Sequence, residues 1–374
     1  MATREEVYAQ APEAGTLLGG LESNGGVEAV LRRRGSHLRE ETGCFPKGTG
    51  VQSPAAGTRW NFRLRKGIPV NTAAQRTMVF GKLCGRIALI AMLALAVRAG
   101  GQKILPGRIL PGWTVPFPPH HIAGNLYYVG SEDLASYLIV TPRGHILINS
   151  SLTESVPLIK TSVEQLGFHF SDIKILLISH AHYDHAEGSE TVLKMTGAKY
   201  YVMDADVPTI ESGGKEDFQY GRDMWAHFPA VKVDRVLHDG DKVELGGAVL
   251  VAHLTPGHTK GTTTWTMDET EGGRTLHAVI VGSPNVNPGY KLAGNKSYPQ
   301  IAEDYKHGFE VLKSLPCDVF LGAHGSYYGL KEKYERWNGG DLDAFIDPSG
   351  YKSFIGDREH AFEAELKRQS TGMQ

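Results

Sequence analysis

Residues 180–188 read HAHYDHAEG and bring together side chains of the types that bind metal ions. His180, His182, Asp184 and His185 are four potential ligands within a run of six residues. Core positions rarely hold such side chains unless they are paired, so packing does not explain the stretch. Zinc sites use histidine nitrogens and carboxylate oxygens, and catalytic zinc sites keep one position open for water. The stretch therefore predicts a metal site.

The spacing within this stretch indicates two metal ions. In an extended chain, side chains two residues apart project to the same side, so His180 and His182 can share one metal. Asp184 and His185 are offset from that pair and can serve a second metal. Two clusters of three ligands need two more residues, which must come from elsewhere in the chain.

Two single histidines in glycine-containing loops are the best candidates for the missing ligands. His258 lies in TPGHTKG and His324 lies in GAHGS, where glycine lets the backbone approach closely. A lone histidine is more often structural than a ligand, but the cluster at 180–185 reverses those odds. The other histidines of the patterned region are interpreted as structural: His120, His121, His145, His169, His227, His238, His253, His277, His307 and His360.

The candidate ligands follow segments that have the pattern of β-strands. Residues 173–179 (IKILLIS) are a continuous apolar run, as expected for a strand buried on both faces, and His180 follows directly. His258 comes shortly after the predicted strand 247–254, and His324 ends the predicted strand 317–324. Ligand sites in open α/β sheets lie beyond the carboxyl ends of strands, so three such ends with histidine support one common site.

Strands and helices occur in two mixed groups from about residue 113 onward. Apolar and β-branched runs predict further strands at 125–130, 135–140, 144–150, 198–203, 236–245, 262–267 and 275–282. Helical spacing of apolar residues predicts helices at 153–167, 189–197, 298–315 and 351–369. Buried strands together with amphipathic helices predict an α/β fold built as a layered sandwich.

The composition is that of an ordinary soluble protein and argues against other classes of function. Of 374 residues, 41% are hydrophobic and 21% are charged. The net charge of −2 gives no electrostatic argument for a nucleic-acid partner, and the arginine run at 32–34 is interpreted as a solvated patch. Cys44, Cys84 and Cys317 form no CxxC pair, so a disulfide framework is not expected.

Residues 78–99 have the pattern of a secretory signal peptide. Lys82 and Arg86 form a short basic region, residues 87–97 are apolar, and Val97 and Ala99 are small residues at the two positions that matter for cleavage. The apolar run is too short for a transmembrane helix, which needs about 20 residues.

A signal peptide belongs at the start of a chain, and this pattern begins at Met78. We therefore expect that Met78 is the true start and that residues 1–77 are a poorly patterned extension from an over-extended reading frame. Residues 100–374 are expected to form the folded domain. The alternative is a buried core helix behind a disordered extension, and N-terminal sequencing of the natural secreted protein would distinguish the two.

Four motifs resemble those of the metallo-β-lactamase superfamily and, more closely, of subclass B3 metallo-β-lactamases. They are HAHYDHAEG, TPGHTKGTTTW, GSPNVNPGYKL and FLGAHGSYYGL, and the resemblance covers about residues 110–374. It implies a four-layer αββα sandwich with a dizinc site between the two β-sheets. It also implies two ligand sets, one for each zinc ion: His180, His182 and His258 for the first, and Asp184, His185 and His324 for the second.

Other positions agree with or depart from the family pattern. Ser283 falls where many superfamily hydrolases have a metal-bridging aspartate, which argues against relatives of glyoxalase II, lactonases and tRNA-processing nucleases. Some relatives pair a cysteine at the position of Cys317 with a later cysteine, and no cysteine follows Cys317 here. The substrate loop, roughly residues 209–228, varies within the family; Phe218, Tyr220 and Trp225 either line a pocket or serve packing.

The resemblance implies hydrolysis of penicillins, cephalosporins and carbapenems, and thereby antibiotic resistance. A hydroxide bridging two Zn²⁺ ions would attack the lactam carbonyl, and Asp184 would anchor the second zinc and orient the hydroxide. Ser283 and Tyr290 are expected to contact the substrate, with loop hydrogen bonding as the alternative role. We expect a periplasmic or secreted enzyme with a small-molecule β-lactam substrate, no nucleic-acid partner and no membrane association in its mature form.

Two other classes of function stay open on the sequence. One is a superfamily hydrolase that acts on a thioester, a lactone or a nucleic acid, although Ser283 and the near-neutral charge balance argue against it. The other is a non-catalytic zinc-binding or scaffold protein. The complete set of six ligands argues against that class, because a protein kept only for binding has no need of an open dizinc site.

Overall fold

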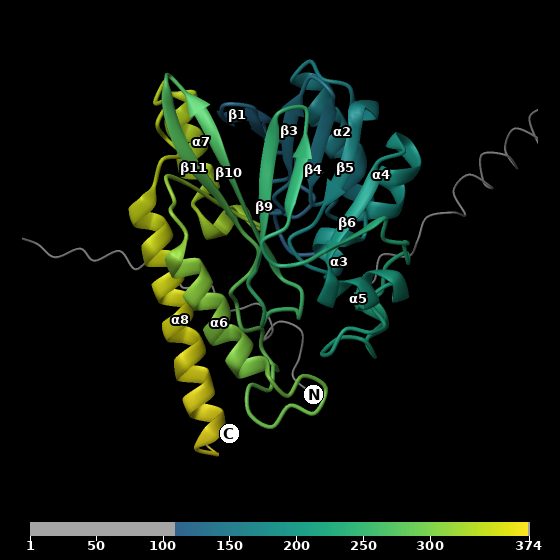
Figure 1. Ribbon diagram of the computed structural model, residues 1–374, viewed down its shortest axis with the longest axis vertical. Coiled ribbons are helices and arrows are strands. Elements are labelled where there is room, and N and C mark those ends of the chain that lie inside the picture. The colour runs from purple at the N-terminus through teal and green to yellow at the C-terminus, as the bar shows by residue number, and fades with distance from the viewer. Residues whose placement is uncertain (1–108, 373–374) are drawn as a thin grey trace, which may run out of the picture. The chain divides into compact units, whose positions relative to one another are not determined.

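Two β-sheets form the centre of residues 109–372, which are the residues that the computed structural model describes (Figure 1). The first sheet has seven strands in the order β1-β2-β3-β4-β5-β6-β7: β1 (His120–Ala123), β2 (Leu126–Tyr128), β3 (Tyr137–Thr141), β4 (Gly144–Ile148), β5 (Ile173–Leu177), β6 (Lys199–Met203) and β7 (Arg235–Leu237). The second has five in the order β12-β11-β10-β9-β8: β8 (Lys242–Leu245), β9 (Ala248–Leu254), β10 (Thr263–Glu271), β11 (Arg274–Val281) and β12 (Val319–Gly322). The predicted extension at 1–77 and signal peptide at 78–99 lie outside the described residues.

Helices cover the outer face of each sheet and complete a four-layer αββα sandwich. In Figure 1, α2 and α4 lie outside the first sheet, and α6 and α8 lie outside the second. The α-helices are α2 (Val156–Gln165), α3 (Tyr183–Ala186), α4 (Ser189–Thr196), α5 (Val207–Ser212), α6 (Ile301–Ser314), α7 (Leu330–Asn338) and α8 (Pro348–Ser370). This is the fold class that the sequence predicts.

The alternation of side chains along the strands of the first sheet fills two separate cores. Tyr137 and Ile139 of β3 belong to the large apolar cluster that also contains residues of the second sheet. Leu138, between them, belongs to a second cluster with the apolar face of α2. Successive residues of a strand point to opposite faces, so a continuous apolar run suits a sheet that is covered on both sides.

The connections of the first sheet explain why strand ends gather at one edge. Strands β1 to β4 pair antiparallel, whereas β4, β5, β6 and β7 pair parallel to their neighbours. Helix α2 leads from β4 to β5, and α4 leads from β5 to β6. Parallel strands place their carboxyl ends at the same edge, and the loops that follow them therefore lie close together.

The structure differs from the sequence predictions at several elements. Residues 236–245, predicted as one strand, divide into β7 of the first sheet and β8 of the second, because the chain turns at 238–241. Strand β1 and helix α7 were not predicted. Helix α8 begins at Pro348 rather than 351, since the Asp347 carboxylate accepts a hydrogen bond from the Gly350 backbone at 2.8 Å and caps the helix.

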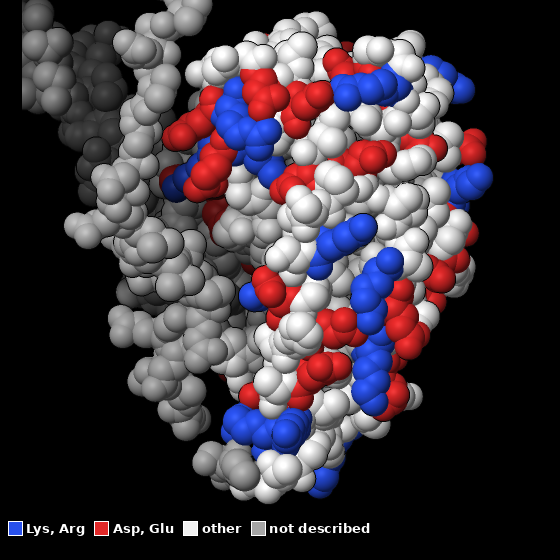
Figure 2. Space-filling view, turned by 90° about the vertical axis from the view of Figure 1, so that its left-hand side faces the viewer, with Lys and Arg blue, Asp and Glu red and all other residues white. Residues whose placement is uncertain are grey.

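Charged side chains of both signs are interspersed on the face that α8 occupies (Figure 2). Ion pairs such as Lys313 with Glu359, at 2.6 Å, join neighbouring helices there. This mixture agrees with the small net charge of the chain. Within residues 109–372, no helix has both the length and the apolar character that crossing a membrane requires.

Candidate metal centre

The six predicted ligands come together from loops that follow three strands. Strand β5 ends at Leu177 and leads to the 180–185 stretch, β9 ends at Leu254 ahead of His258, and β12 ends at Gly322 ahead of His324. The backbone of Thr263 donates to the carbonyl of Ser179 at 2.7 Å, which ties the loop after β5 to the start of β10. Both sheets thus contribute to one site.

The first predicted ligand set forms a compact triad. One ligand atom each from His180, His182 and His258 lie within 4.8 Å of one another. The ring centroid of His180 is 4.9 Å from that of His182 and 4.6 Å from that of His258. All three residues are buried, with exposed fractions of 1%, 8% and 5%. Three imidazoles at this spacing can share a single cation.

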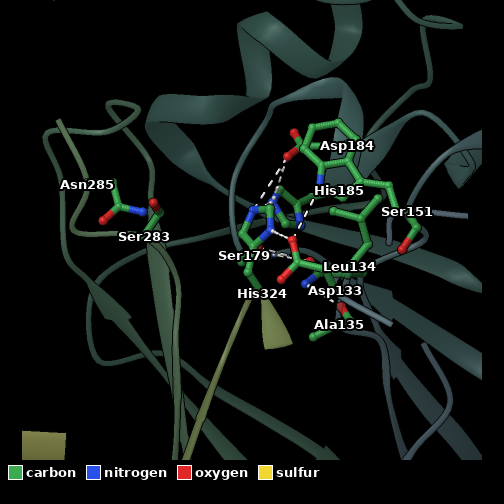
Figure 3. A network of polar contacts seen from close by, with 12 residues as sticks. Asp133, Leu134, Ala135, Ser151, Ser179, Asp184, His185, Ser283, Asn285 and His324 are labelled. Carbon is green, nitrogen blue, oxygen red and sulfur yellow. Dashed lines mark hydrogen bonds and ion pairs between the residues drawn. The ribbon is translucent and has the colours of Figure 1, made fainter. Parts of the chain in front are cut away.

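The second predicted ligand set also comes together in the structure, and Figure 3 shows its three side chains close to one another. Oδ2 of Asp184 is 3.3 Å from Nε2 of His185 and 3.6 Å from Nε2 of His324. The two Nε2 atoms are 3.2 Å apart. A second grouping within 4.8 Å joins His180 to Asp184 and His185, so the two triads are neighbours.

The backbone of the 180–185 stretch differs from the extended loop that the sequence analysis assumed. The chain is extended at His182, with φ −99° and ψ 155°, and then enters the short helix α3 at Tyr183. The Ala186 backbone donates to the His182 carbonyl at 3.0 Å. This helical turn, and not an extended register, sets Asp184 and His185 apart from the first pair.

Hydrogen bonds fix the orientation of two of the histidines. Nδ1 of His258 is 2.8 Å from the backbone carbonyl of Asn285, and Nδ1 of His324 is 3.0 Å from Oδ2 of Asp133. A carbonyl or an ionised carboxylate can only accept, so each Nδ1 must carry the proton. In the neutral form of each ring, Nε2 then carries the lone pair that a metal can use, which is the arrangement in which outer hydrogen bonds orient metal-binding histidines.

The remaining nitrogens indicate that the cluster fits a cation. Nδ1 of His180 and Nδ1 of His185 are buried and have no hydrogen-bond partner among the described residues, whereas Nε2 of His182 faces Oδ2 of Asp217 at 3.5 Å. Buried polar atoms are normally hydrogen-bonded, so two such nitrogens together need an explanation. Five imidazoles, with the carboxylate of Asp184, are a donor set that Zn²⁺ prefers, and the residues present therefore fit a metal ion.

Burial keeps part of the cluster in the form that binds metal. It lowers the pKa of His258 to about 3, with the neighbouring His182 adding to the effect. Burial likewise holds the pKa of His180 well below its usual value. Both imidazoles are therefore neutral at neutral pH. Metal binding requires this neutral form.

Neighbouring carboxylates raise the pKa values of two other histidines of the cluster. Burial alone would lower the pKa of His182 and of His324, but Asp217 beside the first and Asp133 beside the second raise both pKa values. Burial would raise the pKa of Asp184, but His185 and His324 outweigh it and hold that pKa below its usual range. Asp184 is thus an anion at neutral pH.

Ser283, one of two predicted substrate contacts, lies in the loop that follows β11. Its Oγ is 3.0 Å from the hydroxyl of Tyr327, and the side-chain amide of Asn285 donates to the same hydroxyl at 2.8 Å. Figure 3 places Ser283 and Asn285 together, on a segment apart from the one that holds Asp184 and His185. Oδ1 of Asn285 is buried and has no partner among the described residues.

Tyr290, the other predicted substrate contact, is 2% exposed. Its hydroxyl donates to the backbone carbonyl of His258 at 2.9 Å, and its ring packs against Phe218 at 5.1 Å. This geometry agrees with the loop hydrogen-bonding role, in which the Tyr290 hydroxyl holds the backbone of the His258 loop. Its contact with substrate stays a prediction.

The aromatic residues of the 209–228 loop belong to the large apolar core or pack against it, and one of them contacts the metal cluster. The ring centroid of Tyr220 is 5.5 Å from that of His182, whereas Trp225 packs on Tyr183 at 5.7 Å. Phe218 contacts Tyr298 as well as Tyr290. Of the three aromatics that the sequence singled out, Tyr220 is thus in direct contact with a predicted ligand.

Three aspartates next to the site escaped the sequence analysis. Asp133 contacts His324, Asp217 lies 3.5 Å from Nε2 of His182, and Asp206 accepts hydrogen bonds from the loops of both His180 and His258. Each partner is distant in the sequence, so no local pattern marks these residues. Within residues 109–372, none of the histidines interpreted as structural belongs to either metal grouping.

Comparisons with known proteins agree with this geometry. The sequence model of the Metallo-beta-lactamase superfamily matches residues 133–324. The native FEZ-1 metallo-beta-lactamase from Legionella gormanii is 59% identical with a TM-score of 0.69, over 69% of this chain and 98% of that chain. BJP-1, a subclass B3 metallo-beta-lactamase of Bradyrhizobium japonicum, is 34% identical with a TM-score of 0.66, over 71% and 99% of the two chains.

A more distant match connects the chain to the lactamase-like protein vrtG of Penicillium aethiopicum, at 23% identity over 206 residues. That match spans 55% of this chain and 55% of the length of the curated relative. The family match from Asp133 to His324 begins and ends on two residues of the site described above. Together with the high identity to FEZ-1, it shows that the chain belongs to the metallo-beta-lactamase superfamily and resembles its subclass B3 enzymes.

Proposed function

We propose that this chain is a zinc-dependent hydrolase that opens the amide bond of β-lactam antibiotics and holds two zinc ions per chain. The observation that supports it most is the convergence of two neighbouring ligand triads at the ends of β5, β9 and β12. The 59% identity to FEZ-1, a metallo-beta-lactamase by name, favours β-lactams as the substrate class.

The two triads would each hold one ion, divided as the resemblance implies: His180, His182 and His258 on one side, and Asp184, His185 and His324 on the other. Bound zinc supplies a Lewis acid and makes water nucleophilic near neutral pH. No nucleophilic serine is part of the proposal. The chain itself contributes His180 and His258 as neutral imidazoles, Asp184 as an anion, and a fixed place for the substrate.

Asp184 is the proposed catalytic residue among the ligands. Its carboxylate is ionised at neutral pH because His185 and His324 outweigh the effect of burial on its pKa. Oδ2, 3.3 Å from His185 and 3.6 Å from His324, can accept a hydrogen bond from an attacking water and orient it.

Polar groups on the loop after β11 form the proposed substrate-binding side. Tyr327 lies between Ser283 and Asn285 and bonds to both, so its hydroxyl fixes their side chains. Ser283 can donate to the carboxylate or carbonyl that β-lactams contain.

The proposal includes a periplasmic or secreted location, which rests on the signal-peptide pattern at 78–99. β-Lactam hydrolysis in that compartment would give antibiotic resistance. We propose that the mature protein acts on small molecules and needs neither a nucleic acid nor a membrane. The low net charge and the mixed charges of the α8 face support this (Figure 2).

The decisive experiment is an assay of the purified protein on a chromogenic cephalosporin and a carbapenem. Dipicolinate should abolish turnover, added zinc should restore it, and inhibitors that acylate serine should have no effect. His277→Ala, which changes an exposed histidine paired with Asp268, is the control and should keep wild-type turnover. Turnover that survives complete metal removal would contradict the proposal.

A parallel assay separates the lactamase from other hydrolases of the superfamily. A glutathione thioester, a lactone and a tRNA precursor are tested under the same conditions as the two β-lactams. We expect β-lactam turnover and none with the other three. Turnover of only those three would overturn the lactamase assignment and leave the metal centre in place.

A further inference from the structure

A single buried carboxylate connects the two loops that provide the first triad of ligands. Asp206 ends the 3₁₀ turn η3 (Asp204–Asp206), which follows β6, and is 2% exposed. Its Oδ2 accepts hydrogen bonds from the Ala181 backbone at 2.8 Å and from the Thr259 hydroxyl at 2.8 Å. Its Oδ1 accepts one from the Gly261 backbone at 2.9 Å.

The partners of Asp206 are next to the ligands in both loops. Ala181 lies between His180 and His182, and Thr259 directly follows His258. No Lys or Arg forms an ion pair with Asp206 among the described residues, and burial raises its pKa to about 6. A buried carboxylate without a cationic partner is costly, and the three hydrogen bonds from the two ligand loops offset part of this cost.

The local backbone is shaped to receive this carboxylate. A Cβ at Gly261 would lie 2.6 Å from the Asp206 backbone nitrogen and 2.7 Å from its Cγ, so a larger residue at 261 would push the loop away. The Thr259 backbone also donates to Oγ1 of Thr262 at 2.9 Å. The 259–262 turn therefore closes around Asp206 and donates two of the three hydrogen bonds that the Asp206 carboxylate accepts.

We propose that Asp206 is a positioning residue, which holds the His180–His182 loop and the His258 loop at the separation that lets three imidazoles bind one metal. It acts through hydrogen bonds from Ala181, Thr259 and Gly261, which are neighbours of the ligands in the two loops. This inference rests on the proposed metal centre and is independent of the proposed β-lactam substrate.

Asp206→Asn is the sharpest variant, because it keeps the shape and changes one oxygen to an NH₂ group. In either orientation of the amide, that NH₂ faces a backbone N–H, that of Ala181 or that of Gly261, and two donors then oppose each other. At least one loop must shift. Loss of an outer hydrogen-bond partner typically weakens metal affinity roughly 10- to 100-fold, and we expect this range for the first site.

Two controls separate positioning from general destabilisation. Asp234→Asn makes the same chemical change at a carboxylate that accepts a hydrogen bond from the Tyr200 backbone at 3.0 Å. That hydrogen bond involves neither of the two ligand loops. Ile159→Ala removes packing between α2 and the first sheet and lowers stability without touching the ligand loops. Both controls should keep the zinc affinity of the wild type.

The test is a zinc titration of the full chain, freed of metal, against a competing chromophoric chelator. All variants are made in a His324→Ala background, so that the titration reports the first site. Thermal unfolding of the metal-free proteins is measured alongside. Asp206→Asn should weaken zinc binding at least about tenfold, and by more than an Ile159→Ala protein of equal or lower stability.

The outcomes distinguish this inference from the proposed function. Zinc affinity of Asp206→Asn equal to that of the background would overturn the positioning role, whereas absence of zinc binding in the background and wild type would overturn the metal centre itself. If Asp206→Asn does not fold, Thr259→Val replaces it. That variant removes the hydroxyl donor and keeps the two backbone hydrogen bonds to Asp206. Its zinc affinity should fall about threefold to tenfold, and an unchanged affinity would contradict the inference.

Discussion

The carboxylate of Asp133 accepts a hydrogen bond from Nδ1 of His324 at 3.0 Å, although the two residues are 191 positions apart. The Ser326 backbone donates to the other oxygen of Asp133 at 3.0 Å, and the Trp113 indole donates to Oδ2 at 3.2 Å. Asp133 is therefore held in place and in turn fixes the face that His324 presents to the second triad (Figure 3).

Asp133→Ala should weaken the second zinc site roughly 10- to 100-fold, because His324 loses the acceptor that selects its tautomer and orientation. The measurement is zinc affinity by chelator competition in a His258→Ala background. Asp343→Ala, which removes an exposed partner of Arg274, is the control. Equal affinities in the Asp133→Ala and control proteins would show that His324 needs no such support.

Replacement of single ligands should remove one metal at a time. His258→Ala should lower the zinc content from two ions per chain toward one by loss of the first site, and His324→Ala should do the same at the second. Metal analysis after gel filtration measures the content, with His277→Ala as the control. Full metal content and full activity in both ligand variants would show that the ligand assignment is wrong.

Gly257, the residue before His258, should not tolerate a side chain. It has φ +128°, and an added Cβ would lie 2.5 Å from Cγ of Tyr305, whose hydroxyl donates to the Asn285 carbonyl at 2.7 Å. Overpacking of this kind typically costs about 1–3 kcal/mol beyond the backbone strain. Gly257→Ala should therefore unfold at lower denaturant concentration and bind zinc at the first site more weakly.

Gly247→Ala is the matched control for that variant. Gly247 also has a positive φ, +102°, but an added Cβ would meet no atom within 4 Å. Both variants carry backbone strain, and the difference between their free energies of unfolding isolates the contact with Tyr305. Equal destabilisation of the two would mean that the Tyr305 ring moves aside at no cost.

Glu269 should make the stability of the protein depend on pH near neutrality. Burial, with a smaller effect of Glu271, raises its pKa from 4.5 to about 7, against a backbone hydrogen bond from Asn125 that lowers it. The folded state then holds the proton more tightly than the unfolded state. The contribution of Glu269 to the free energy of unfolding is fully present below pH 4.5. It is lost as the pH rises to about 7, and the loss is at most about 3 kcal/mol.

Glu269→Gln should remove that dependence. The variant should be more stable than the wild type at pH 8 and nearly equal to it at pH 4.5, as measured by urea unfolding of metal-free protein. Glu244→Gln, on an exposed position of β8, should show no such difference. A variant that is less stable than the wild type at pH 8 would contradict the assigned direction.

The sequence by itself determined the candidate metal-binding stretch and most of the secondary structure. Four potential ligands within residues 180–185 are recognisable because they are close along the chain. Strands such as β5 and β9, and helices such as α2 and α6, follow from local periodicity. Because ligand sites in open α/β sheets lie beyond the carboxyl ends of strands, the sequence also predicted that His258 and His324 would join the stretch.

Only the tertiary structure decided how those ligands are held. Asp133, Asp206 and Asp217 reach the site from other segments, and an aspartate with a distant partner has the same local sequence pattern as an exposed one. The same holds for Tyr290, whose hydroxyl is directed to the His258 backbone. Hydrogen bonds between remote loops depend on where the sheets place those loops, and that placement results from packing of the whole core.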